Sequence, residues 1–284
     1  MSAQFKMTTL KTAAAVRIGK RATLTLVVPC YNESQRLQRD EFISFVDNMP
    51  RVDVLFVNDG SKDNTLDVLN GLAAERPGRI SVLDMPQNGG KAEAVRAGLA
   101  HALASGVQMV AYWDADLATP LFLVEDFLRV AERDSKIEVI FGSRRRMLGH
   151  KVSRTLHRRI VSTICANLAR MAIGMPIADT QCGAKLLRNT PAVAAAVQEK
   201  FTAGWLFDVE LFARIARHGN REDHCFYEQP LSEWTEIPGS KVSTSAIVKS
   251  GLRMVRLIAE LRLSRGAKAA VAATVPAHPF AKVA

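Results

Sequence analysis

Short runs of apolar and β-branched residues recur along the first half of the chain, each followed by a polar cluster and then by a segment with helical spacing. Such runs predict strands buried on both faces, and their alternation with helices predicts βαβ units in a mostly parallel, twisted sheet of α/β class. The expected strands are 24–28, 52–57, 80–83, 108–113 and 138–141, and the expected helices between them are 34–48, 64–75, 91–105 and 120–133.

Three polar clusters directly follow three of these runs: Tyr31-Asn32-Glu33, Asp59-Gly60-Ser61 and Asp114-Ala115-Asp116. In open α/β sheets, ligands bind in the crevice outside the carboxyl ends of the strands. Three clusters in equivalent places are harder to obtain by accident than one. The pattern therefore predicts a ligand site at this edge of the sheet.

Asp114 and Asp116 form the sharpest pair in the sequence. Two carboxylates separated by one small residue can face one pocket, where they repel each other unless a cation lies between them or one is protonated. Oxygen ligands of this kind suit Mg²⁺ or Mn²⁺ bridged to phosphates. The alternative is a loop acid that caps a helix near Thr119, and the strand-end position favours the metal.

Several further groups have a binding and a structural interpretation. Asp59 can accept a hydrogen bond from a nucleobase or ribose, or close a turn. Asn88 to Lys91 can bind an anion at a helix start, or form an ordinary turn and cap. Arg144 can clamp a phosphate, or belong to a solvated basic loop. Gly239 to Lys241 can bind a phosphate, or form a surface turn.

After Gly142 the pattern changes to a basic segment that becomes helical up to residue 173. A helix is expected over 205–218, and its apolar start contains Asp208 and Glu210, which are costly to bury unless paired or functional. We favour function. The other expected elements are an extended segment at 179–188, a strand at 222–227 and a basic amphipathic helix at 244–264.

The 284-residue chain carries a formal net charge of +10, which favours anionic partners such as nucleotides or a phospholipid surface. It shows no pattern of interleaved aromatic residues typical of nucleic-acid binding. The four cysteines lack zinc-ligand spacing and are expected to be buried free thiols in a reducing compartment. The most apolar stretch, 161–178, is interrupted by polar residues, so we expect no membrane span.

The motifs together resemble family-2 glycosyltransferases of the GT-A fold, and within them the polyprenyl-phosphate (dolichyl-phosphate) β-glucosyltransferases. The resemblance covers roughly residues 24–262, with its motifs in family order. Four motifs are generic to the family: 28–33, 58–63, 88–91 and 114–116. Gly142-Ser143-Arg144 follows these, and three motifs are more specific to the polyprenyl-phosphate branch: 179–185, 207–211 and 234–241.

The resemblance implies a role for each matching residue. Asp59 would hold uracil, and Asp114 and Asp116 would be the metal ligands. The residues implied to bind the nucleotide sugar are Pro29, Tyr31, Glu33, Asp59, Lys91, Asp114, Ala115 and Asp116. Those implied to meet phosphates or the acceptor are Arg144, Asp179, Trp234, Ser240 and Lys241, and those implied to act in catalysis are Asp208, Asp116 and Arg144.

The resemblance implies an inverting, metal-dependent transfer of a hexose, glucose from UDP-glucose, to a polyprenyl phosphate. That acceptor oxygen is already anionic, so it needs no strong base. A soluble hydroxyl acceptor is the alternative, and its base would be Asp208 first and Asp179 second. A catalytically silent nucleotide-sugar binder is a further alternative, disfavoured by the intact Asp114-Ala115-Asp116.

The expected organisation is a flexible basic arm over 1–22, a GT-A catalytic domain over 23–243, the amphipathic helix over 244–264 and a disordered tail over 265–284. The expected place is the cytoplasm, with peripheral contact to the cytoplasmic face of a membrane through the basic helix. A homo-oligomer remains open.

Overall fold

The computed structural model describes residues 22–145, 147–152, 163, 166–167, 170–171, 173–218, 225–237 and 253. Apart from Ala22 and Arg253, the expected basic arm, amphipathic helix and tail lie outside the described residues, and so do Ser240 and Lys241. No helix among the described residues is long and apolar enough to cross a membrane.

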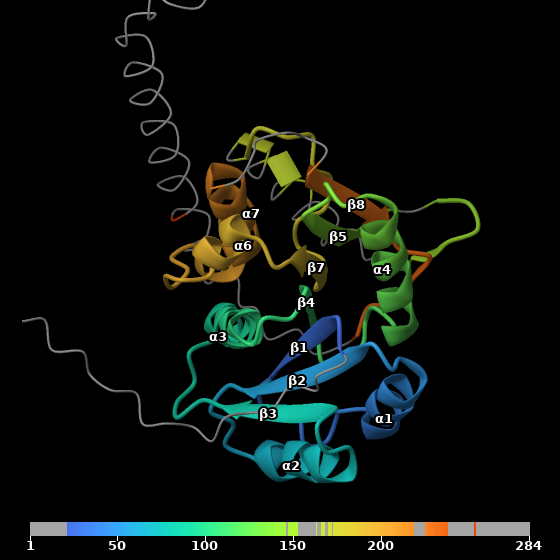
Figure 1. The fold of residues 1–284 in the computed structure, drawn as a ribbon, viewed down its shortest axis with the longest axis vertical. Helices are drawn as coiled ribbons and strands as arrows, with labels where there is room; N and C mark the ends of the chain where they lie inside the picture. The colour runs from blue at the N-terminus through green and yellow to red at the C-terminus, as the bar shows by residue number, and fades with distance from the viewer. Residues whose placement is uncertain are drawn as a thin grey trace, which may run out of the picture.

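A seven-stranded sheet in the order β3-β2-β1-β4-β7-β5-β8 forms the centre of the molecule (Figure 1). All its strands are parallel except β7, which lies antiparallel between β4 and β5. The mostly parallel sheet expected from the sequence is confirmed. The strands are β1 (Leu24–Cys30), β2 (Val52–Asn58), β3 (Ile80–Asp84), β4 (Met109–Trp113), β5 (Val139–Ser143), β7 (Ala184–Arg188) and β8 (Phe226–Pro230).

Helices cover both faces of the sheet (Figure 1). On one face lie α3 (Lys91–Ala104), α6 (Pro191–Ala196) and α7 (Phe207–His218). On the other lie α1 (Arg39–Asn48), α2 (Thr65–Glu75) and α4 (Val124–Arg133), with short 3-10 turns at 121–123 and 204–206 before α4 and α7. Every residue of β2 and β4 is buried, because both faces of these strands are covered.

The strand order reverses direction at β1. The chain runs from β1 through β2 to β3 on one side, and β4 then pairs with the opposite edge of β1. A reversal of this kind opens a crevice at the carboxyl ends of the two central strands. The polar clusters that follow β1, β2 and β4 therefore meet at one edge, as the sequence predicts.

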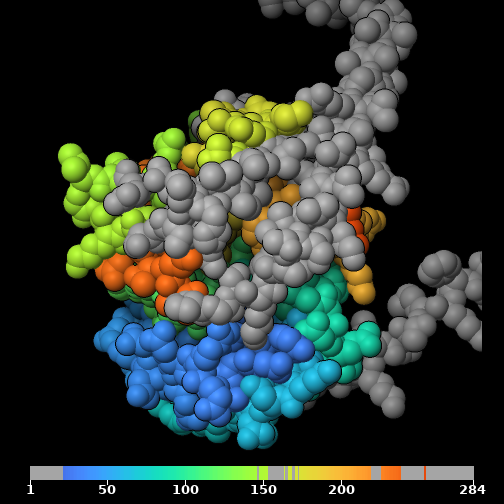
Figure 2. All heavy atoms as spheres, turned by 180° about the vertical axis from the view of Figure 1, so that it is seen from behind, coloured from blue at the N-terminus to red at the C-terminus, as the bar shows by residue number. Residues whose placement is uncertain are grey.

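A second, two-stranded sheet pairs β6 (Lys151–Val152) with β9 (Glu233–Trp234). Figure 2 shows the corresponding yellow-green and orange segments side by side on the rear face. The pairing brings Trp234 close to the loop that follows β5, although about 80 residues separate them in the sequence. The expected strand at 222–227 begins instead at Phe226 and extends to Pro230.

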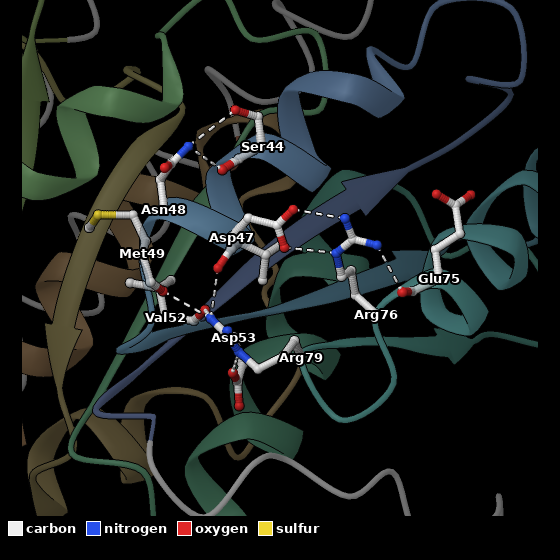
Figure 3. A network of polar contacts seen from close by, with 10 residues as sticks. Ser44, Asp47, Asn48, Met49, Val52, Asp53, Glu75, Arg76 and Arg79 are labelled. Carbon is white, nitrogen blue, oxygen red and sulfur yellow. Dashed lines mark hydrogen bonds and ion pairs between the residues drawn. The ribbon is translucent and has the colours of Figure 1, made fainter.

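A polar network fastens α1 to the opposite end of the sheet (Figure 3). The Arg79 guanidinium donates to Asp53 at 2.8 Å and to the carbonyl oxygens of Val46, Met49 and Val52 at 2.8–3.0 Å. These carbonyls belong to the end of α1 and the turn into β2. One side chain therefore joins the end of α1, the turn and the first residue of β2 through their carbonyl oxygens.

We expect Arg79→Met to lower the free energy of unfolding by about 2–4 kcal/mol, because the buried Asp53 carboxylate and three carbonyl oxygens lose a shared donor. Arg76→Met is the matched control: Arg76 pairs with Asp47, whose side chain is 49% exposed, so its loss is expected to cost much less stability than the loss of Arg79. Urea unfolding of both variants measures the difference. Equal losses would contradict the role given to Arg79.

Candidate functional site

The Asp59 carboxylate ties the end of β2 to the start of α3. Asp59 is 2% exposed and accepts hydrogen bonds from the Gly89 N–H at 2.7 Å and from Asn88 Nδ2 at 3.0 Å. Burial raises the pKa of Asp59, although the N–H groups of Gly89 and Gly90 oppose the rise. Gly60 has φ +57°, and a Cβ there would lie 2.4 Å from the Asn88 nitrogen, so the two loops pack backbone to backbone.

The loop after β1 is fastened to the loop after β2 by side chains of the two polar clusters and by Thr65, which sequence reasoning did not single out. The Asn32 N–H donates to Ser61 Oγ at 3.1 Å, and Asn32 Oδ1 accepts from the Lys62 N–H at 2.8 Å. Asn32 has a positive φ of 52°, which asparagine adopts more readily than most residues. The Glu33 N–H donates to Thr65 Oγ1 at 2.8 Å.

These contacts place Pro29, Tyr31 and Glu33 beside Asp59. Pro29 is the last residue but one of β1 and pairs in register with Val57. Tyr31 is half-buried, and the Glu33 carboxylate pairs with Arg36 at 2.6 Å. The first two polar clusters thus lie side by side at the carboxyl ends of β1 and β2.

Asp114 follows β4 and forms an ion pair with Lys91, the first residue of α3, with Oδ1 and Nζ 2.5 Å apart. Burial lowers the pKa of Lys91, but Asp114, Asp208 and Asp116 outweigh it and raise that pKa. The ammonium therefore lies in the field of three carboxylates. Although 47% of the Lys91 side chain is exposed, its ammonium is buried against the Asp114 carboxylate.

Asp114 packs against Gly183, the residue just before β7. The Asp114 N–H donates to the Gly183 carbonyl at 3.0 Å. A Cβ at Gly183 would lie 1.9 Å from Asp114 Oδ2, a distance at which no atom can be accommodated. The Asp114 carboxylate consequently lies directly against the Gly183 backbone.

Asp116 is partly buried, and its Oδ1 accepts from the Ala118 N–H at 3.1 Å. Burial and the neighbouring Asp114 raise the pKa of Asp116, while the Ala118 N–H and Lys91 oppose the rise. Ala115, between the two acids, is buried and holds their backbone in place. Two carboxylates that destabilise each other's charge are suited to a bound cation.

The donor set fits Mg²⁺ or Mn²⁺, because both ligands predicted from the sequence are hard carboxylate oxygens. Among the described residues, no group of three or more histidine, cysteine, aspartate or glutamate side chains could hold a metal. An ion at Asp114 and Asp116 would therefore take its other ligands from water or a bound phosphate, which is usual for Mg²⁺.

Asp208, in the first turn of α7, lies under this site and is 4% exposed. Its Oδ1 pairs with Lys185 Nζ at 2.9 Å and accepts a hydrogen bond from the Tyr112 hydroxyl. Glu210, the second acid of that helix start, instead pairs with Arg214 at 2.7 Å and accepts from the N–H groups of Thr202 and Ala203. Both buried acids are thus partnered.

Arg144, Asp179 and Trp234 meet at the end of β5. The Arg144 guanidinium donates to Asp179 in a bidentate pair at 2.7 and 2.8 Å, and lies 5.3 Å from the centre of the Trp234 ring. Burial lowers the pKa of Arg144, but the Asp179 carboxylate outweighs it and raises that pKa. The fold therefore unites three residues that the sequence singled out separately.

Comparison with known proteins supplies the context for this geometry. Residues 25–194 match the family model described as Glycosyl transferase family 2. A dolichyl-phosphate beta-glucosyltransferase of Trichomonas vaginalis is 33% identical over 245 residues, which cover 82% of this chain and 70% of that protein. The dolichyl-phosphate beta-glucosyltransferase of Homo sapiens is 30% identical over 237 residues, which cover 77% and 69%.

Among solved structures, the glucosyl-3-phosphoglycerate synthase of Mycobacterium tuberculosis in complex with UDP matches with a TM-score of 0.58 and 16% identity, covering 84% of this chain and 81% of that one. The same synthase with Mn²⁺ and UDP-glucose matches with a TM-score of 0.56 and 17% identity, covering 87% and 79%. The expected GT-A fold is confirmed by these likenesses.

Proposed function

This chain belongs to glycosyl transferase family 2 and is a glycosyltransferase, and from that premise we propose that it moves glucose from UDP-glucose to a polyprenyl phosphate with inversion. The observation that carries the proposal is that four residues lie together at the carboxyl ends of β1, β2 and β4: Asp59, Lys91, Asp114 and Asp116. The names of the relatives support the glucosyl donor and the lipid phosphate.

The donor would lie along this crevice. Pro29, Tyr31, Glu33 and Asp59 would bind the base and ribose, and Asp114 the ribose or sugar. Asp114 and Asp116, with Ala115 between them, would hold Mg²⁺ or Mn²⁺ beside the diphosphate. When bound, the divalent ion supplies positive charge next to the departing UDP, where such charge is most effective. Lys91 would add a second positive charge to the diphosphate.

The acceptor side favours a phosphate over a hydroxyl. A hydroxyl acceptor needs a base, and the two carboxylates considered for that role are already paired with cations, Asp208 with Lys185 and Asp179 with Arg144. A polyprenyl phosphate needs none, because its oxygen is anionic at neutral pH. Arg144, positioned by Asp179 and Trp234, would meet that phosphate, and Ser240 and Lys241 stay predicted partners outside the described residues.

The lipid acceptor places the reaction at a membrane surface. We propose peripheral contact with the cytoplasmic face, supported by the net charge of +10, which favours anionic headgroups.

The direct test is a transfer assay with radiolabelled UDP-glucose, Mn²⁺ and dolichyl phosphate in liposomes. We expect label in the lipid fraction, released by mild acid. GDP-mannose replaces the donor in one control, and a soluble hydroxyl acceptor replaces the lipid in another. Transfer only to the hydroxyl acceptor, or only from GDP-mannose, would overturn the proposal.

Lys91→Met is expected to change the affinities for Mn²⁺ and for UDP in opposite directions. Because the ammonium already neutralises Asp114, its removal should tighten Mn²⁺ binding in the absence of nucleotide by about tenfold and weaken UDP binding by about tenfold. Electron paramagnetic resonance of free Mn²⁺ and calorimetry with UDP measure the two affinities. Lys62→Met, at an exposed lysine, is the control, and unchanged Mn²⁺ affinity in Lys91→Met would contradict the prediction.

The pH dependence of Mn²⁺ binding follows from the raised pKa of Asp116. The ionised carboxylate binds the metal, so a raised pKa means that protonation competes at higher pH than for an ordinary aspartate. We expect Mn²⁺ affinity to fall as the pH is lowered. The fall should begin at a higher pH than for an ordinary aspartate, whose pKa is about 4. Mn²⁺ titrations between neutral and acidic pH check this. A flat profile down to that range would contradict it.

A further inference from the structure

The Lys185 side chain enters the interior from β7 and is fully buried. Its ammonium donates to the Cys182 carbonyl at 2.6 Å and to the Tyr112 hydroxyl at 2.8 Å, and pairs with Asp208 at 2.9 Å. It also lies 4.9 Å from the centre of the Tyr112 ring and 5.5 Å from that of Phe212. An ammonium enclosed by these groups is held in one position.

The carbonyl that Lys185 binds belongs to the peptide bond between Cys182 and Gly183. Gly183 in turn carries Asp114, through the hydrogen bond from the Asp114 N–H and the close contact of the Asp114 carboxylate with the Gly183 backbone. Residues 112 and 185 are paired in the β4–β7 register, so Lys185 enters the sheet two residues after Gly183 and opposite the residue two before Asp114. A continuous series of contacts therefore joins Lys185 to Asp114.

A buried ion pair is weak evidence for stability, because desolvation of both charges offsets their attraction. The same helix α7 carries a second such pair, Arg214 with Glu210, whose hydrogen bonds within the described part of the chain go to the 196–203 segment rather than to residues 182 or 183. The Lys185–Asp208 pair differs because it touches the peptide that supports Asp114. That difference separates a positioning role from general packing.

We propose that Lys185 is a positioning residue: by binding the Cys182 carbonyl, it fixes the Cys182–Gly183 peptide and thereby the carboxylate of Asp114. Asp208 and Tyr112 hold the ammonium in place, which gives buried Asp208 a role at the donor site without contact to the acceptor. The inference rests on the proposed function, since Asp114 serves the UDP-sugar and its metal there.

The test compares two double variants of the full chain. Lys185→Met with Asp208→Asn removes both charges, so no unpaired charge is left buried to destabilise the fold. The Asn side chain can still accept a hydrogen bond from the Tyr112 hydroxyl. Arg214→Met with Glu210→Gln removes the matched ion pair from the same helix. Thermal unfolding confirms that each variant folds, and calorimetry measures the Kd of UDP in the presence of Mn²⁺.

We expect the Lys185 and Asp208 double variant to bind UDP with Mn²⁺ about tenfold more weakly, because an unsupported Asp114 is no longer held in the binding position. In the transfer assay, the KM for UDP-glucose should rise about tenfold while the KM for the lipid acceptor stays unchanged. The Arg214 and Glu210 double variant should lose stability but keep its Kd within about twofold of wild type.

Wild-type UDP affinity in the folded Lys185 and Asp208 double variant would overturn the inference, and so would an equal loss of affinity in the Arg214 and Glu210 double variant. A wild-type protein that binds UDP with Mn²⁺ but transfers no glucose would overturn the proposed acceptor and leave the positioning role supported by the binding data. A wild-type protein that binds no UDP would overturn both.

Discussion

Replacing Asp116 by Asn is expected to reduce glucosyl transfer by about 100- to 1,000-fold while the protein remains folded. Asparagine keeps an oxygen for the Ala118 N–H, so the local turn survives. It removes the negative charge that would hold Mg²⁺ or Mn²⁺, and with it the positive charge beside the departing UDP. The measurements are kcat in the lipid transfer assay and Mn²⁺ affinity in the presence of UDP.

The control for this variant is Asp134→Asn. Asp134 follows α4, and its carboxylate accepts a hydrogen bond from the Lys136 N–H at 2.9 Å. Asp116 makes the same contact with the N–H two residues later, but Asp134 lies far from the crevice. Its transfer rate should equal that of wild type. Full activity in Asp116→Asn, or equal losses in both variants, would refute the assignment of Asp116 to the metal.

Gly183→Ala is expected to reduce UDP affinity and transfer by about 100-fold or more, although the side chain gained is a single methyl group. That methyl would lie 1.9 Å from Asp114 Oδ2 and 2.2 Å from Asp114 Cγ, so the carboxylate has to leave its position. Overpacking of this kind also lowers the free energy of unfolding by about 1–3 kcal/mol. Calorimetry with UDP and Mn²⁺ measures the affinity.

Gly98→Ala provides a control in which the added methyl group is also severely crowded. A Cβ at Gly98 would lie 2.4 Å from Val27 Cγ1 and 2.7 Å from Val57 Cγ2, inside the core between α3 and the sheet. The folded fraction of this variant should bind UDP as wild type does, despite similar or greater loss of stability. If Gly183→Ala binds UDP normally, Asp114 does not need the position that the structure gives it.

The sequence predicted the architecture well because its information is local. The runs that form β1, β2 and β4 are continuously apolar and β-branched, and each is followed at once by its polar cluster. Once such strands are parallel, Asp59 and Asp114 must come to the same edge. α6 was missed, although Thr190 followed by Pro191 signals a helix start, and the Thr190 hydroxyl accepts from the Val193 N–H.

The pairings within the site could not be predicted in the same way. Arg144 and Asp179 are 35 residues apart, and nothing in the sequence tells that they form a bidentate pair rather than two separate binding groups. Lys185 belongs to the motif 179–185, but sequence reasoning assigned it no role, since its burial depends on α7 packing over β7. Such contacts depend on which segments the tertiary fold brings together.

Local patterning by itself determined an α/β fold with acids at the strand ends, because strand burial and turn chemistry depend on near neighbours. The resemblance of its motifs to a known family then indicated a glycosyltransferase. Only the tertiary structure decided which of those acids are paired with cations and which remain for a ligand. The physical reason is the antiparallel pairing of β7 between β4 and β5. This pairing brings Gly183, just before β7, and Lys185, within it, close to Asp114, although about 70 residues separate them in the sequence.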